Sequence, residues 1–214
     1  MSKAESLAPL LVEQLRDLMD AERQLTKALP KLAKASSSPE LRAAFEEHLS
    51  ITEEHIQRLS EVFEQLGERA RGKKCVGMQG LVEEGQEKID TTEAGPTRDA
   101  AIIAAAQSTE HYEMAGYGTC RTWAQLLGHD DIVSLLEQTL NDEKEADQKL
   151  TGIAEGLVNI EAAEEETSEA RGRAGSDRWV AAESTRTSGS RPAGGSPRGR
   201  RSSGGSRRRT TKKR

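Results

Sequence analysis

The chain has 214 residues, of which 34% are hydrophobic, 31% are charged and 3% are aromatic, and its mean hydropathy is -0.72. This apolar share is low for a single compact globule, so the composition predicts either a disordered part or a heavily solvated helical fold. No apolar run of about 18 residues occurs, which excludes a transmembrane helix from the prediction. The first ten residues lack the basic start and the apolar stretch of a secretory signal.

The cysteine content gives the expected compartment. Cys75 and Cys120 lie far apart in the sequence and form no Cys-x-x-Cys pair. They indicate neither a disulfide framework nor a zinc–thiolate site. We therefore expect a cytoplasmic protein in a reducing environment.

Charge is divided unevenly along the chain. Residues 171–214 hold 14 Lys and Arg against 2 Asp and Glu, whereas residues 1–170 hold 17 against 34. The basic part is rich in Ser, Gly, Arg and Pro, and such a composition cannot bury enough apolar surface to offset the entropy of the chain. We expect residues 171–214 to be disordered, and we divide the chain into an acidic body over 1–165 and a basic tail over 166–214.

The body is predicted to be helical, because apolar residues recur three and four positions apart in four long runs. Each run has the apolar seam that is typical of a helix bundle. No pattern typical of a strand is visible. The runs cover residues 11–32, 41–66, 103–127 and 133–157.

The residues between the runs predict how the helices connect. Ser38 and Pro39 are suited to the N-cap and first position of the second helix, and Gly67 to its end. Gly128 marks a short turn before the last helix. The connection between the second and third helices is long and contains a short amphipathic piece, Leu81–Ile89. We predict an all-α, ferritin-like four-helix bundle with a long crossover that carries a short fifth helix.

Polar residues interrupt all four seams near their middles. Counted from the two predicted hairpin turns at about 1.5 Å per residue, these interruptions lie at one depth in the bundle. Five carboxylates and two imidazoles are thereby aimed at a common interior. They are Glu22 on the first helix, His48 and His55 on the second, Glu110 and Glu113 on the third, and Glu143 and Asp147 on the fourth.

Several buried carboxylates that lie close together repel one another strongly. They must be neutralised by cations, be protonated or face water. Two divalent cations resolve the problem most simply, and an oxygen-rich ligand set with one or two imidazoles suits iron, or manganese, better than structural zinc. The seven residues are therefore candidate metal ligands, although the Glu-x-x-His pair of known di-iron bundles is absent from the second and fourth helices.

Other polar residues of the body are weaker candidates for metal ligands. Thr52 is expected to form hydrogen bonds to ligand residues rather than to bind metal itself. Tyr117 is expected either to be a core residue or to orient a ligand. His111 and His129 lie off the seams and are expected to face solvent. The acidic residues around His55 on the second helix are read as a solvated face.

Four stretches, at 17–35, 48–67, 104–128 and 135–150, resemble the YciE/YciF-like family of ferritin-like proteins, which are relatives of rubrerythrin. The resemblance covers about residues 7–158 and recurs on all four helices in order. It implies a ferritin-like bundle, a dimetal site, a bacterial stress-response setting and a dimeric assembly. It implies no particular reaction.

Two functions remain open at this point. One is an oxidoreductase that couples Fe(II) oxidation to the reduction of O2 or peroxide; no rubredoxin-like cysteine pairs are present to deliver electrons. The alternative is a non-enzymatic, nucleoid-associated stress protein whose basic tail binds nucleic acid without sequence preference and whose bundle is structural or sequesters metal. For the tail, a merely solubilising role, docking on the acidic body, and contact with a membrane or another polyanion also remain open.

Overall fold

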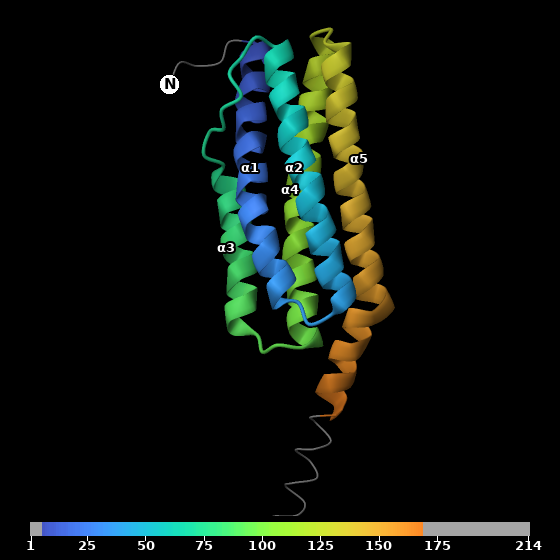
Figure 1. The fold of residues 1–214 in the computed structure, drawn as a ribbon. Coiled ribbons are helices and arrows are strands. Elements are labelled where there is room, and N and C mark those ends of the chain that lie inside the picture. The colour runs from blue at the N-terminus through green and yellow to red at the C-terminus, as the bar shows by residue number, and fades with distance from the viewer. Residues whose placement is uncertain (1–5, 169–214) are drawn as a thin grey trace, which may run out of the picture. The chain divides into compact units, whose positions relative to one another are not determined.

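The computed structural model describes residues 6–168, and these residues are almost entirely helical (Figure 1). No strand occurs within that range. A short π-helical segment, Ala154–Val158, follows the last long helix, and residues 159–168 continue as helix beyond the predicted boundary at 165. Residues 169–214 of the predicted basic tail lie outside the described residues. The helices are α1 (Leu7–Ala35), α2 (Pro39–Gln65), α3 (Val76–Thr91), α4 (Pro96–Leu126) and α5 (Asp130–Ile153).

The predicted ferritin-like topology is confirmed. The hairpins α1–α2 and α4–α5 pack side by side, with α1 against α4 and α2 against α5. Because the connection from α2 to α4 runs along the length of the bundle, α2 and α4 point the same way (Figure 1). The short helix α3 belongs to this connection and covers α1 and α4 from outside. It starts before the predicted Leu81, because Cys75 caps its first turn by accepting a hydrogen bond from Met78 N at 3.3 Å.

Side chains at the predicted boundaries begin and end the helices. The Ser38 hydroxyl accepts a hydrogen bond from Leu41 N at 3.3 Å at the start of α2. The carboxylate of Asp99, at the start of α4, accepts two more from the backbone N–H groups of Ser37 and Ser38, at 2.9 and 2.6 Å. Gly67 and Gly128 follow α2 and α4 with φ of 67° and 78°, a left-handed conformation that favours glycine.

Two separate apolar clusters fill the bundle, and a polar layer lies between them. One cluster contains Leu25, Phe45, Ala106 and Leu150; the other contains Leu18, Leu59, Tyr117 and Leu140. On every long helix, the candidate ligands fall in the interval between the two clusters. The structure therefore confirms that the four seam interruptions share one depth.

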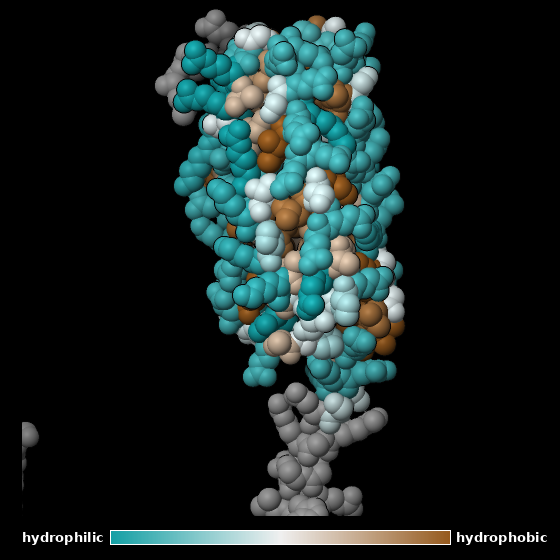
Figure 2. All heavy atoms as spheres, in the orientation of Figure 1, coloured by the Kyte–Doolittle hydropathy of each residue, from teal (hydrophilic) through white to brown (hydrophobic). Residues whose placement is uncertain are grey.

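The outside of the bundle is hydrophilic over most of the face in Figure 2, with apolar side chains scattered along it. Within residues 6–168, no helix combines the length and apolar character needed to cross a membrane.

Candidate metal centre

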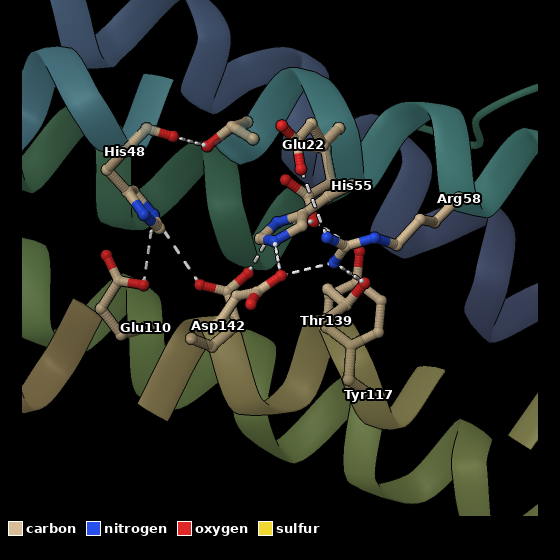
Figure 3. Close-up of polar contacts among 11 residues, drawn as sticks. Glu22, His48, His55, Arg58, Glu110, Tyr117, Thr139 and Asp142 are labelled. Carbon is tan, nitrogen blue, oxygen red and sulfur yellow. Dashed lines mark hydrogen bonds and ion pairs between the residues drawn. The ribbon is translucent and has the colours of Figure 1, made fainter. Parts of the chain in front are cut away.

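Six of the seven candidate ligands converge in the polar layer between the two apolar clusters, and the close-up in Figure 3 shows most of this arrangement. Their carboxylates and imidazoles come from all four long helices. None of them is more than 6% exposed. They are Glu22 from α1, His48 and His55 from α2, Glu110 and Glu113 from α4, and Glu143 from α5.

Five of these side chains form two groups that share Glu143. In the inner group, Nδ1 of His55 lies 3.3 Å from Glu22 Oε1 and 3.1 Å from Glu143 Oε1. In the outer group, Nε2 of His48 lies 3.4 Å from Glu110 Oε2 and 3.7 Å from Glu143 Oε2. Glu143 thus offers one oxygen to each group, which is the arrangement of a carboxylate that bridges two ions.

The donor atoms in these groups are close but mostly not hydrogen-bonded. Both oxygens of Glu143, Nδ1 of His55, Nε2 of His48 and Oε2 of Glu110 are buried without a hydrogen-bond partner among residues 6–168. Such atoms are rare in folded proteins and costly when isolated. Two ligands at about 2.1 Å from one ion are separated by about 3.0 Å if octahedral neighbours and about 3.4 Å if tetrahedral. The four separations between an imidazole nitrogen and a carboxylate oxygen, 3.1 to 3.7 Å, lie close to these values, and all donor atoms of each group lie within 4.8 Å of one another, so the residues fit a pair of metal ions.

The imidazoles and carboxylates of the cluster shift one another's pKa values. Burial by itself lowers the pKa of each imidazole, but the adjacent carboxylates outweigh it, raising the pKa of His48 to about 9 and that of His55 to about 10. Burial raises the pKa of Glu143 to about 8 against the opposing effect of His55. Burial also raises the pKa of Glu110, but its close imidazole, His48, leaves that pKa lowered overall. Without metal ions, the cluster therefore retains protons at neutral pH.

Glu113 belongs to the polar layer but to neither group. Its side chain is fully buried, and neither of its oxygens has a hydrogen-bond partner. Burial, together with the nearby carboxylates of Glu22, Glu143 and Glu110, raises its pKa well above the usual value. Burial and the neighbouring carboxylates thus favour the protonated form of Glu113, which offers further oxygen atoms beside the two groups.

Asp147 is the candidate that the structure places elsewhere. Its Oδ1 accepts a hydrogen bond from Gln107 Nε2 at 3.1 Å and lies 3.4 Å from His111 Nε2. It lies one helical turn beyond Glu143, and Glu143 rather than Asp147 occupies the level of the two imidazoles. The proposal that Asp147 is a ligand therefore has no geometric support.

Two residues that the sequence did not single out orient His55. Asp142 Oδ2 lies 3.3 Å from His55 Nε2, and Arg58 Nη1 holds the same oxygen at 2.5 Å (Figure 3). When Nε2 donates its hydrogen to Asp142, Nδ1 presents a lone pair to the inner group. Asp142 was not recognised because it lies off the α5 seam, beside Glu143; no periodicity signal identifies it.

The contacts and exposure of the other polar residues considered above are also defined in the structure. The Tyr117 hydroxyl donates to Glu22 Oε1 and so orients an inner-group carboxylate. The Thr52 hydroxyl donates a hydrogen bond to the backbone oxygen of His48, at 2.9 Å. This bond does not involve the side chain of a candidate ligand. His111 and His129 are exposed, as the sequence predicted.

The comparisons with known proteins agree with this fold. Protein YciF of Escherichia coli strain K12 is 45% identical over 159 residues, which are 74% of this chain and 96% of that protein. The crystal structure of the E. coli stress protein YciF matches with a TM-score of 0.70 at 44% identity, covering 73% of this chain and 99% of that one. The structure of YcfI from Rhodopseudomonas palustris matches at 0.67 and 42% identity, over 69% and 94% of the two chains.

A more distant structure, from Xanthomonas campestris, is 21% identical with a TM-score of 0.60 over 75% of this chain and 99% of that one, and it supports the fold alone. The family model described as "Domain of unknown function (DUF892)" matches residues 6–163. The YciF-like resemblance of the four helices is confirmed: the chain belongs to the DUF892 family, whose relatives include YciF of E. coli.

Proposed function

We propose that the chain is a dimetal carboxylate protein that couples Fe(II) oxidation to the reduction of peroxide or O2. The observation that carries the proposal is the pair of groups sharing Glu143, whose buried donor atoms lack hydrogen-bond partners. Glu22 and His55 would hold one ion, His48 and Glu110 the other, and Glu143 both. The oxygen-rich donor set favours iron, with manganese as the second choice.

Two Fe(II) ions held by these residues would supply two electrons, which with two protons would convert H2O2 into two water molecules while both ions become Fe(III). The chain's own residues prepare the interior for this reaction. The two apolar clusters limit access of water from both ends of the bundle. Tyr117 orients Glu22, Asp142 orients His55, and burial favours a proton on Glu113 beside the ligands.

A protective role in the cytoplasm is part of the proposal. It is supported by the E. coli relative, which is described as a stress protein. The homodimer implied by the family resemblance is likewise a proposal, and sedimentation of the full chain tests it.

The test is metal content and peroxide consumption of the full chain loaded anaerobically with Fe(II). We expect about two ions per chain and consumption of about one H2O2 per two ions oxidised. Glu143→Gln should lose most of the metal, because it removes a donor from both groups. Asp147→Asn is the matched control on the same helix and should retain both ions. A Glu143→Gln protein with unchanged metal content rules out the site.

The basic clusters favour a second function, the binding of nucleic acid through residues 171–214. Arg198-Gly199-Arg200-Arg201, Arg207–Arg209 and Lys212–Arg214 can pair with phosphates, and such binding weakens steeply with salt. No aromatic residue lies among these clusters, so stacking on bases is not expected. Gel shifts at two salt concentrations, with the full chain and with the Arg and Lys residues of all three clusters changed to Gln, test this function. Equal shifts for both proteins would reject it.

A further inference from the structure

A cavity of about 200 Å³ lies between α2 and α5 and reaches the outer group. Among the residues that line it are His48 and Glu110, which are 6% and 2% exposed. Both nitrogens of His48 and Oε2 of Glu110 lack a hydrogen-bond partner. The cavity therefore ends on buried donor atoms that are available to a ligand.

The rim of this cavity is predominantly acidic. Glu47 on α2 and Glu145 on α5 are exposed, and Asp142 is partly exposed. Lys149 is the one lysine or arginine among the lining residues, and its Nζ lies 2.6 Å from Glu47 Oε2, which links α2 to α5 across the cavity. Arg58 neutralises Asp142 from outside the lining, at 2.5 Å. Glu145 forms no ion pair with another of residues 6–168, and it therefore contributes a negative charge near the opening.

We infer that this cavity is the route by which hydrated divalent cations reach the dimetal site, with Glu145 attracting them and the Lys149–Glu47 ion pair opposing their passage. The inference rests on the proposed function. The volume is well above that of a single water, so a cation can enter with part of its hydration shell. Glu110 and His48 then replace water molecules of that shell, and Glu143 is the next donor inward.

The alternative route through the opposite side of the outer group is less suitable. A second cavity, between α1, α3 and α4, also reaches Glu110, but its volume is only about 20 Å³. Its walls include Leu25, Leu29, Leu81 and Val82. A hydrated ion would find only Thr109 and Glu110 there to replace the water it loses, because the other lining residues are apolar. Within residues 6–168, the side chains of the inner group are closed off from solvent, because Glu22, His55 and Glu143 are each 0% exposed.

The experiment measures the rate at which the metal-free full chain takes up Co(II) under anaerobic conditions, followed by the absorbance of the bound ion. Glu145→Gln should slow uptake about two- to five-fold, and Lys149→Gln should accelerate it by a similar factor, because each changes the charge at the opening by one. Both effects should shrink at 1 M salt, where charges are screened within about 3 Å. The final amount of metal per chain should equal that of the unmodified protein in both variants.

Two further variants make the outcome decisive. Ala146→Phe places a bulky side chain in the cavity lining and should slow uptake at every salt concentration. Glu84→Gln, which removes an exposed charge from α3, is the control and should leave the rate unchanged. If the protein takes up metal but the Glu145, Lys149 and Ala146 variants all load at the original rate, the route is wrong and the proposed function stands. If the unmodified chain takes up no metal, the proposed function fails, and the route fails with it.

Discussion

Glu143 places its Oε1 atom 3.1 Å from Nδ1 of His55, while its other oxygen faces Nε2 of His48 at 3.7 Å. The two imidazole rings lie seven residues apart on α2, with their centroids 6.4 Å from each other. One carboxylate therefore connects two groups of donors that would otherwise be separate. Each of the other four residues in these groups belongs to one group only.

Glu22→Gln and Glu110→Gln should each remove about one metal ion per chain, since each residue belongs to one group only. An amide has one oxygen in place of two and no charge, so it binds a divalent cation more weakly than a carboxylate does. Elemental analysis after dialysis measures the remaining metal. A Glu22→Gln protein that loses the outer ion as well would show that the two groups do not bind independently.

The metal-free protein should lose stability as the pH rises from about 6 to 10. His48 and His55 have folded-state pKa values of about 9 and about 10, above the ordinary 6.5, so their protonation stabilises the fold fully below pH 6.5 and is lost through pH 9–10. Glu143, with its pKa raised to about 8, acts in the same direction between pH 4.5 and 8. Thermal unfolding at several pH values measures the effect.

Bound metal ions should reduce this pH dependence, because they replace the protons that the cluster holds. Loading the site in a weakly buffered solution at pH 7 should therefore release protons, which a pH indicator detects. An equal fall of Tm with pH for the metal-free and metal-loaded proteins would contradict this account of the cluster.

Asp142→Asn should weaken metal binding by about 10- to 100-fold while changing stability little. The substitution removes the charge that holds the hydrogen on Nε2 of His55 and that pairs with Arg58. Competition with a chelator of known affinity measures the loss. Glu54→Gln is the control, because it removes only the exposed partner of Arg58, at 3.4 Å, and should leave the affinity unchanged.

Asp99→Ala should destabilise the bundle by about 1–3 kcal/mol without changing the metal content. Its buried carboxylate accepts the hydrogen bonds of two backbone N–H groups at the start of α2, and these groups would lose their partner. Chemical denaturation of the metal-free protein measures the change. Asp131→Ala, at an exposed position in the first turn of α5, should cost much less. A comparable loss in both variants would show that a general charge effect, rather than the buried cap, is responsible.

The helices and the depth of the polar layer could be predicted from the sequence, because both follow from local rules. Apolar residues three and four apart define the buried face of each helix, and Ser38, Gly67 and Gly128 mark where helices begin and end. The rise per residue then places Glu22, His55 and Glu143 at one level without knowledge of the packing. The family resemblance, which the comparisons confirm, rests instead on the likeness of four sequence stretches and not on these rules.

The choice between neighbouring carboxylates on α5 depended on the tertiary structure. Asp147 lies on the predicted seam yet pairs with Gln107 and His111, whereas Asp142 lies off the seam and contacts His55. Periodicity gives the direction of a side chain only to within a broad sector of the helix surface. Which donors share an ion depends on separations of about 3 Å between atoms on different helices, and those separations are fixed only when the four helices pack.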